Sequence, residues 1–195
     1  MILYDNELLL DFPIKKIQRV LKLGKEKFIR AIDINKIMQI HDNDIELLLK
    51  RMQSEGYIER IEETLIYVNT IKGNLIASTN LIQTMSRDIA NKKVAELLER
   101  VKKVNDENFF LYTVKMVKVY GEYIDKDKEY ITRIDILTIL EERAEENTNI
   151  YNDSIYTKDY ENLLRYLKAN THGLMINSYQ IFFQTKNIKG EIIYC

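Results

Sequence analysis

The chain has 195 residues, of which 46% are hydrophobic and 30% are charged, and its formal net charge is −1. This balance is typical of a folded globular protein and argues against intrinsic disorder. A net charge so close to zero provides no overall positive field of the kind that attracts nucleic acid. The single cysteine, Cys195, excludes a disulfide framework and a cysteine-based metal site.

The cellular location of the protein can be predicted from its first residues and from the length of its apolar runs. No run approaches the roughly 18 apolar residues that a membrane-spanning helix requires. The opening stretch, MILYDNELLLDF, lacks the basic segment that begins a signal peptide. We therefore expect a cytoplasmic protein with no membrane partner. His41 and His172 have no metal-ligand spacing around them, so no metal site is expected at either.

Residues 1–80 predict three helices followed by a two-stranded ribbon. Helices are expected from apolar spacing and capping signals over residues 14–23, 34–40 and from Asp42 or Asn43 to Gly56. The segments YIERI (57–61) and LIYVN (65–69) read as short strands joined across Glu62 and Glu63. This order of elements is that of a winged helix-turn-helix domain.

The charges of this first domain do not decide which class of partner it binds. In a winged helix the first turns of the third helix enter the DNA major groove, and here they are the acidic stretch DNDIE, residues 42–46. The ribbon tip, Glu62 and Glu63, is acidic too, and both features oppose the counterion release that drives DNA binding. The partner is either nucleic acid or a protein, and a homodimer is a further option. The candidate binding residues are the cations Lys15, Lys16, Arg19, Lys22, Lys50 and Arg51.

Residues 81–195 predict a second domain. Ser86 begins a strongly amphipathic helix that runs to Asn105 and links the two parts of the chain. Beyond it we expect a small mixed β-sheet with flanking helices. The expected strands cover residues 116–120, 131–140, 173–184 and 191–195, and a further helix covers residues 159–168. The fold class is therefore α+β.

Four stretches carry a resemblance to a known family. They are IYVNTIKGNLIAS (66–78), SRDIANKKVAELLERVKKVNDENFFLYTVKMVKVYG (86–121), RIDI (133–136) and GLMINSYQ (173–180). Together they resemble the bacterial minimal nucleotidyltransferase-domain proteins of the DNA polymerase β superfamily that carry an N-terminal winged helix. The resemblance spans about two thirds of the chain and implies a nucleotidyltransferase-like second domain in a protein of bacterial or phage origin.

The family's catalytic motif is degenerate in this sequence. The family has a Gly-Ser loop that cradles a triphosphate, and an Asp-x-Asp pair whose side chains share one face of a strand and hold Mg²⁺. Gly121 matches the glycine, but Glu122 stands in place of the serine. Asp135 matches the second aspartate, whereas Arg133, which cannot bind a metal, replaces the first. We expect Arg133 and Asp135 to form an ion pair on one face of the strand.

Two functions of different class follow from this resemblance. The first is a catalytically degenerate protein that binds a partner or regulates it through its winged helix, with no cofactor. The second is an active transferase that uses Mg²⁺ and a nucleoside triphosphate to modify a protein or RNA. In the second, Glu122 or Glu129 would join Asp135 at one metal ion, and Arg133 would hold a phosphate. The arginine at position 133 favours the first.

Overall fold

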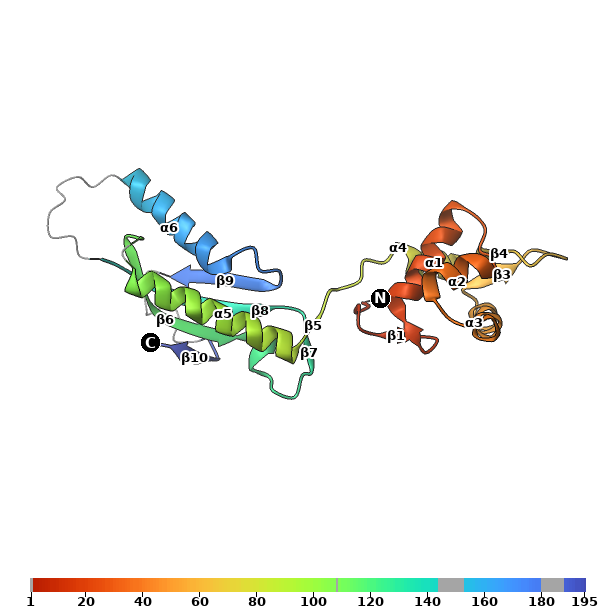
Figure 1. The fold of residues 1–195 in the computed structure, drawn as a ribbon, viewed down its shortest axis with the longest axis horizontal. Helices are drawn as coiled ribbons and strands as arrows, with labels where there is room; N and C mark the ends of the chain where they lie inside the picture. The colour runs from red at the N-terminus through yellow and green to blue at the C-terminus, as the bar shows by residue number, and fades with distance from the viewer. Residues whose placement is uncertain (1, 108, 144–152, 180–187) are drawn as a thin grey trace. The chain divides into compact units, whose positions relative to one another are not determined.

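The computed structural model describes residues 2–107, 109–143, 153–179 and 188–195 (Figure 1). It is a mixed α+β protein with small sheets, which confirms the fold class predicted from the sequence. Contacts divide the chain into two compact units, Met1–Gln83 and Thr84–Cys195, where the sequence places the boundary between residues 80 and 81. Within the described ranges, every helix is too short or too polar to cross a lipid bilayer.

Unit 1 consists of a short hairpin, four helices and a two-stranded ribbon. In chain order its elements are β1 (Leu8–Leu9), β2 (Phe12–Pro13), α1 (Ile14–Glu26), α2 (Ala31–Met38), α3 (Asp42–Ser54), β3 (Ile58–Arg60), β4 (Tyr67–Asn69) and α4 (Ile71–Ser78). One apolar core unites the helices, and its fully buried members include Ile17, Leu21, Ile34, Leu48, Met52 and Ile58. The helical spacing of these residues along α1, α2 and α3 places them on the inward faces.

The ribbon of unit 1 gains a third backbone segment. β3 and β4 pair antiparallel with Glu59 opposite Val68. On the other edge of β4, Ile29 and Tyr67 exchange two backbone hydrogen bonds of 2.8 and 2.9 Å. The segment between α1 and α2 is thereby tied to the ribbon, and the buried Ile29 joins the core. The ribbon therefore has a fixed position relative to α2 and α3.

The helix after the ribbon packs closely on α1. Thr70 caps α4, since its hydroxyl accepts from the Gly73 backbone N–H at 3.1 Å. A β-carbon at position 73 would overlap the Tyr57 carbonyl oxygen, so glycine allows this approach. The buried Gln18 of α1 donates to the carbonyls of Ile76 (3.0 Å) and Thr79 (2.6 Å) at the end of α4. These bonds attach the C-terminal end of α4 to α1.

Unit 2 is built around one four-stranded sheet. Its elements are β5 (Met85–Ser86), α5 (Arg87–Asp106), β6 (Tyr112–Tyr120), the 3₁₀ turn η1 (Gly121–Ile124), β7 (Tyr130–Ile131), β8 (Ile134–Glu142), α6 (Asp153–Lys168), β9 (Leu174–Tyr179) and β10 (Gly190–Tyr194). The strand order is β10-β6-β8-β9. β6 is antiparallel to both of its neighbours, whereas β8 and β9 are parallel and α6 connects them.

The two faces of this sheet have different roles. Alternate strand residues, among them Val119, Ile136 and Leu174, share one core cluster with Leu97 of α5 and Leu163 of α6. Figure 1 shows both helices running alongside the strands. The strand residues that alternate with these core residues lie on the opposite face of the sheet. We call it the distal face and define it by Lys118, Tyr120, Asp135, Leu137, Met175 and Asn177.

Candidate functional site

Gly121 and Asp135 meet at the end of β6. Tyr120 lies opposite Asp135 in the β6–β8 pair, and η1 begins at the next residue, Gly121, whose φ is +71°. A β-carbon at position 121 would lie 2.6 Å from Asp135 Oδ2. Glycine is therefore needed here both for the left-handed backbone and for the close approach of the carboxylate.

Arg133 covers the carboxylate of Asp135. Its Nε lies 3.1 Å from each carboxylate oxygen of Asp135, two residues further along the chain. The Asp135 side chain is only 9% exposed, whereas that of Arg133 is 61% exposed. The guanidinium therefore neutralises the carboxylate from the solvent side, and it offers no lone pair to a cation.

Glu122 holds the two ends of the η1–β7 loop together. Its carboxylate oxygen Oε2 accepts hydrogen bonds from the Thr132 backbone N–H at 2.8 Å and from the Thr132 hydroxyl at 2.7 Å. The other oxygen, Oε1, lies 3.1 Å from Lys128 Nζ. From the sequence we expected this carboxylate to lie where the family's phosphates bind. In the structure it is bonded to the loop instead.

These bonds lower the pKa of the Glu122 carboxyl group below its ordinary value. The Thr132 backbone N–H has the largest effect, and the Thr132 hydroxyl and Lys128 act in the same direction, while burial opposes them. All three donors bond the ionised form, so the loop is closed by a carboxylate rather than a carboxylic acid.

Replacing Glu122 with glutamine should change how stability depends on pH. Because the folded-state pKa lies below the unfolded value of about 4.3, Glu122 stabilises the parent above that pH and loses its effect as pH falls through the folded value. The parent should be more stable than Glu122→Gln at neutral pH, and the two should converge in acid, as urea denaturation at a series of pH values would reveal. Glu141→Gln, which removes a surface ion pair with Lys115, is the control. A gap between parent and Glu122→Gln that stays constant into acid would contradict this role.

The strand beside Asp135 supplies no second carboxylate. In the parallel β8–β9 pair, Met175 is the register partner of Asp135, and its side chain is 45% exposed on the distal face. The next residue of β9 on this face, Asn177, donates to the Tyr120 hydroxyl at 2.7 Å. The sequence alone could not show which residue lies next to Asp135. That depends on the register of two strands separated by α6.

The residues of this site do not fit the Mg²⁺ that the family resemblance implies. Mg²⁺ prefers several oxygen ligands in an octahedral arrangement. Here Asp135 is bonded to Arg133, and Glu122 is bonded to Thr132 and Lys128. Among the residues that the structure describes, no group of three or more His, Cys, Asp or Glu side chains could hold a metal ion. The structure therefore brings Gly121, Arg133 and Asp135 together as a glycine turn beside an ion pair.

In unit 1, half of the candidate cations are already bonded internally. Lys15 pairs with Asp5 at 2.6 Å, Lys16 donates to the Met38 carbonyl at 2.8 Å, and Arg51 pairs with Asp11 at 2.6 Å. Of the remaining three, Arg19 and Lys22 are exposed on α1 and Lys50 is exposed on α3. The cations therefore do not all remain available to a phosphate backbone.

A groove lies between α3 and the ribbon of unit 1. Its volume is about 280 Å³. Its lining residues are Ala31, Glu46, Leu49, Lys50, Arg60, Leu65 and Tyr67. Leu65 is 74% exposed, and Ile32 and Leu47 are also exposed. Sequence analysis did not find this groove, because its apolar residues come from separate elements.

Comparison of the chain with protein-family models, with curated proteins and with solved structures gives no match.

Proposed function

We propose that the chain is a binding protein in which a winged helix-turn-helix unit is joined to a nucleotidyltransferase-like unit with a degenerate catalytic site. The order α5, β6, glycine turn, β8, α6 and β9 supports the likeness of unit 2 to a nucleotidyltransferase. Three helices followed by the β3–β4 ribbon, with Ile29 paired to β4, support a winged helix in unit 1.

The observation that carries the proposal is the Arg133–Asp135 ion pair. In the family the two positions hold carboxylates that share a pair of metal ions and stabilise the charge developing on the transferred phosphoryl group. Arg133 places a cation at 3.1 Å from Asp135 instead. The pair supplies the charge balance that the metal ions would supply, so this sheet keeps its arrangement without a metal-dependent reaction.

A protein is the partner that unit 1 fits best. The exposed first turns of α3 carry Asp42, Asp44 and Glu46, and the ribbon tip carries Glu62 and Glu63. These exposed acids disfavour a phosphate backbone, and one of them, Glu46, also lines the groove. The apolar side chains in and around the groove fit a partner segment with large apolar residues flanked by Lys or Arg.

A combined assay of the purified full chain tests this function. We expect no magnesium-dependent transfer of label from radioactive nucleoside triphosphates to protein or RNA in a cell extract. We also expect duplex DNA binding, measured by fluorescence anisotropy, to be weak at low salt and absent at physiological salt, because the exposed acids oppose contact with phosphates. The variant Asp135→Ala tests whether any transfer depends on this carboxylate. The double variant Lys50→Ala with Arg51→Ala tests whether any DNA binding depends on the cations of α3.

Two outcomes would overturn the proposal. Transfer that is lost in Asp135→Ala would make the chain an active nucleotidyltransferase. DNA binding that survives physiological salt and is lost in Lys50→Ala with Arg51→Ala would make nucleic acid the partner of unit 1.

A further inference from the structure

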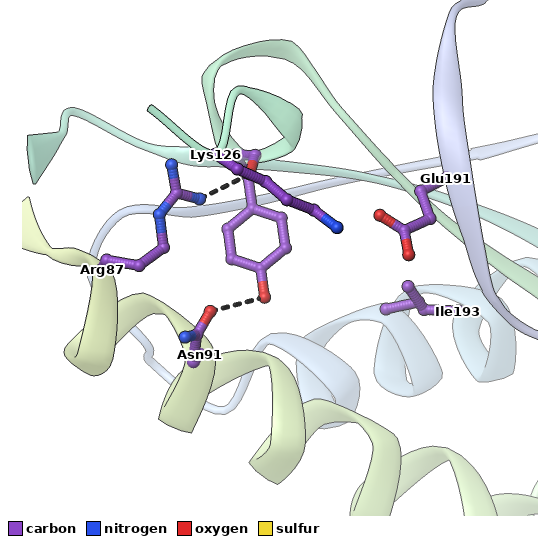
Figure 2. Close-up of a pocket in the computed structure, with 6 residues that line it drawn as sticks. Arg87, Asn91, Lys126, Glu191 and Ile193 are labelled. Carbon is purple, nitrogen blue, oxygen red and sulfur yellow. Dashed lines mark hydrogen bonds between the residues drawn. The ribbon is translucent and has the colours of Figure 1, made fainter. Parts of the chain in front are cut away.

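A cavity in unit 2 lies on the helix side of the sheet (Figure 2). Its volume is about 390 Å³, and it is lined by Arg87, Asn91, Tyr123, Lys126, Glu191 and Ile193. Glu191 of β10 is the register partner of Val119, whose side chain belongs to the core beneath α5. The cavity is therefore on the opposite side of the sheet from Asp135.

Arg87 fixes one wall of this cavity. Its guanidinium donates to the backbone carbonyls of Tyr123 (2.5 Å), Lys128 (2.8 and 3.2 Å) and Asp125. It also lies over the Tyr123 ring, with its central carbon 5.3 Å from the ring centroid. Arg87 thus holds the loop after η1 in place with its donors, and the wall is formed before any ligand binds.

Tyr123 is fixed at its other end as well. Its hydroxyl donates to Asn91 Oδ1 at 2.9 Å, a bond drawn in Figure 2. Burial raises the pKa of Tyr123, and the negative charge of Glu191 raises it further, while Arg87 opposes both. The carboxylate of Glu191 therefore acts on the tyrosine across the cavity, and the aromatic ring remains neutral and rigid.

Lys126 and Glu191 are oppositely charged groups on two sides of the same cavity. Figure 2 shows the lysine ammonium and the glutamate carboxylate directed toward each other, with Ile193 beside Glu191. Among the residues that the structure describes, neither side chain makes a hydrogen bond or an ion pair. The cavity therefore presents one free cation and one free anion next to an apolar surface formed by Tyr123 and Ile193.

We propose that this cavity binds a small zwitterion of the free amino acid class. Glu191 would hold the ammonium group of the ligand, Lys126 would hold its carboxylate, and its apolar side chain would pack on Tyr123 and Ile193. The cavity volume falls in the range usual for small-molecule sites. A ligand with one charge only would leave the other protein charge without a partner, which disfavours simple anions and simple amines. This inference does not depend on the function proposed for unit 1 or for the distal face.

Calorimetric titration of the full chain tests the proposal with matched ligands. The probes are L-phenylalanine, L-leucine, N-acetyl-L-phenylalanine, which lacks the ammonium group, and L-phenylalaninamide, which lacks the carboxylate. We expect the two amino acids to bind in a saturable way and each analogue to bind about tenfold more weakly than phenylalanine, because one charge-assisted contact is lost.

Two variants assign each contact. Glu191→Gln should remove the preference for phenylalanine over its N-acetyl analogue, and Lys126→Gln should remove the preference over the amide. Lys115→Gln, on the exposed Lys115–Glu141 ion pair of the same unit, should leave all affinities unchanged. The proposal is overturned if neither amino acid binds at millimolar concentration, or if both variants keep the preferences of the parent.

Discussion

Replacing Gly121 with alanine should lower the free energy of unfolding of unit 2 by about 2 to 4 kcal/mol. One part of this loss comes from the backbone, because φ at Gly121 is +71°, where alanine is strained. The other part comes from the new β-carbon, which would lie 2.6 Å from Asp135 Oδ2. The buried carboxylate would have to move away from Arg133. Urea denaturation, followed by a probe specific to unit 2, measures the loss.

Gly56 provides a matched control for this substitution. Its φ is also +71°, but a β-carbon there would have no heavy atom within 4 Å. Gly56→Ala should therefore cost only the backbone part, about 1 kcal/mol, measured on the unfolding of unit 1. If Gly121→Ala costs no more than Gly56→Ala, the close approach of Asp135 to the glycine turn contributes nothing to stability.

Replacing Arg133 with aspartate should also destabilise unit 2, by about 2 to 4 kcal/mol in the absence of metal. Removing one partner of a buried ion pair typically costs about 3 to 5 kcal/mol, and the cost is smaller here because the Arg133 side chain is 61% exposed. The new carboxylate adds repulsion with Asp135, since both would lie on the same face of the strand. Thermal denaturation with and without millimolar MgCl₂ measures the effect.

The comparison with Arg133→Ala separates the two contributions. Both variants lose the ion pair, but only Arg133→Asp restores the two carboxylates that a divalent cation can bridge. Mg²⁺ should therefore raise the melting temperature of Arg133→Asp and leave that of Arg133→Ala unchanged. Adding Asp135→Asn to Arg133→Asp should abolish the rise. If Arg133→Ala is as stable as the parent, the ion pair does not replace a metal, and the main physical argument for a degenerate site is lost.

Local signals in the sequence were sufficient for several elements of the fold. Ser86 was predicted to begin the long helix, and its hydroxyl caps α5 by accepting from the Ile89 N–H. The spacing of Arg133 and Asp135 indicated a shared face, and the structure contains the ion pair between them. Caps and i, i+2 relations depend on residues a few positions apart, so they can be inferred without knowing the tertiary structure.

Elements that depend on distant partners were predicted less well. The strand expected to begin at residue 116 begins at Tyr112, because a register shift between Val114 and Met116 interrupts the alternation. The sequence also did not show that Ile82, after the end of α4 at Ser78, pairs through its backbone with residues near the N-terminus. The predicted strand residues 180–184 lie outside the described residues. The sequence could not show the contacts of Glu122 or Met175, or the presence of the cavity beside Tyr123. These contacts depend on strand register and on the hydrogen bonds that Arg87 makes with a distant loop.

The strand order of unit 2 also determines when each candidate site can form during folding. The Gly121–Asp135 contact belongs to the β6–β8 pair, whose strands are joined by a short loop, so little chain entropy is lost in closing it. Glu191 reaches the cavity only when β10 pairs with β6, and Gly190 and Tyr120 are 190 − 120 = 70 positions apart. Such long-range pairing is slow compared with local pairing. The ion-pair site can thus exist in a partly folded chain, whereas the cavity requires the completed sheet.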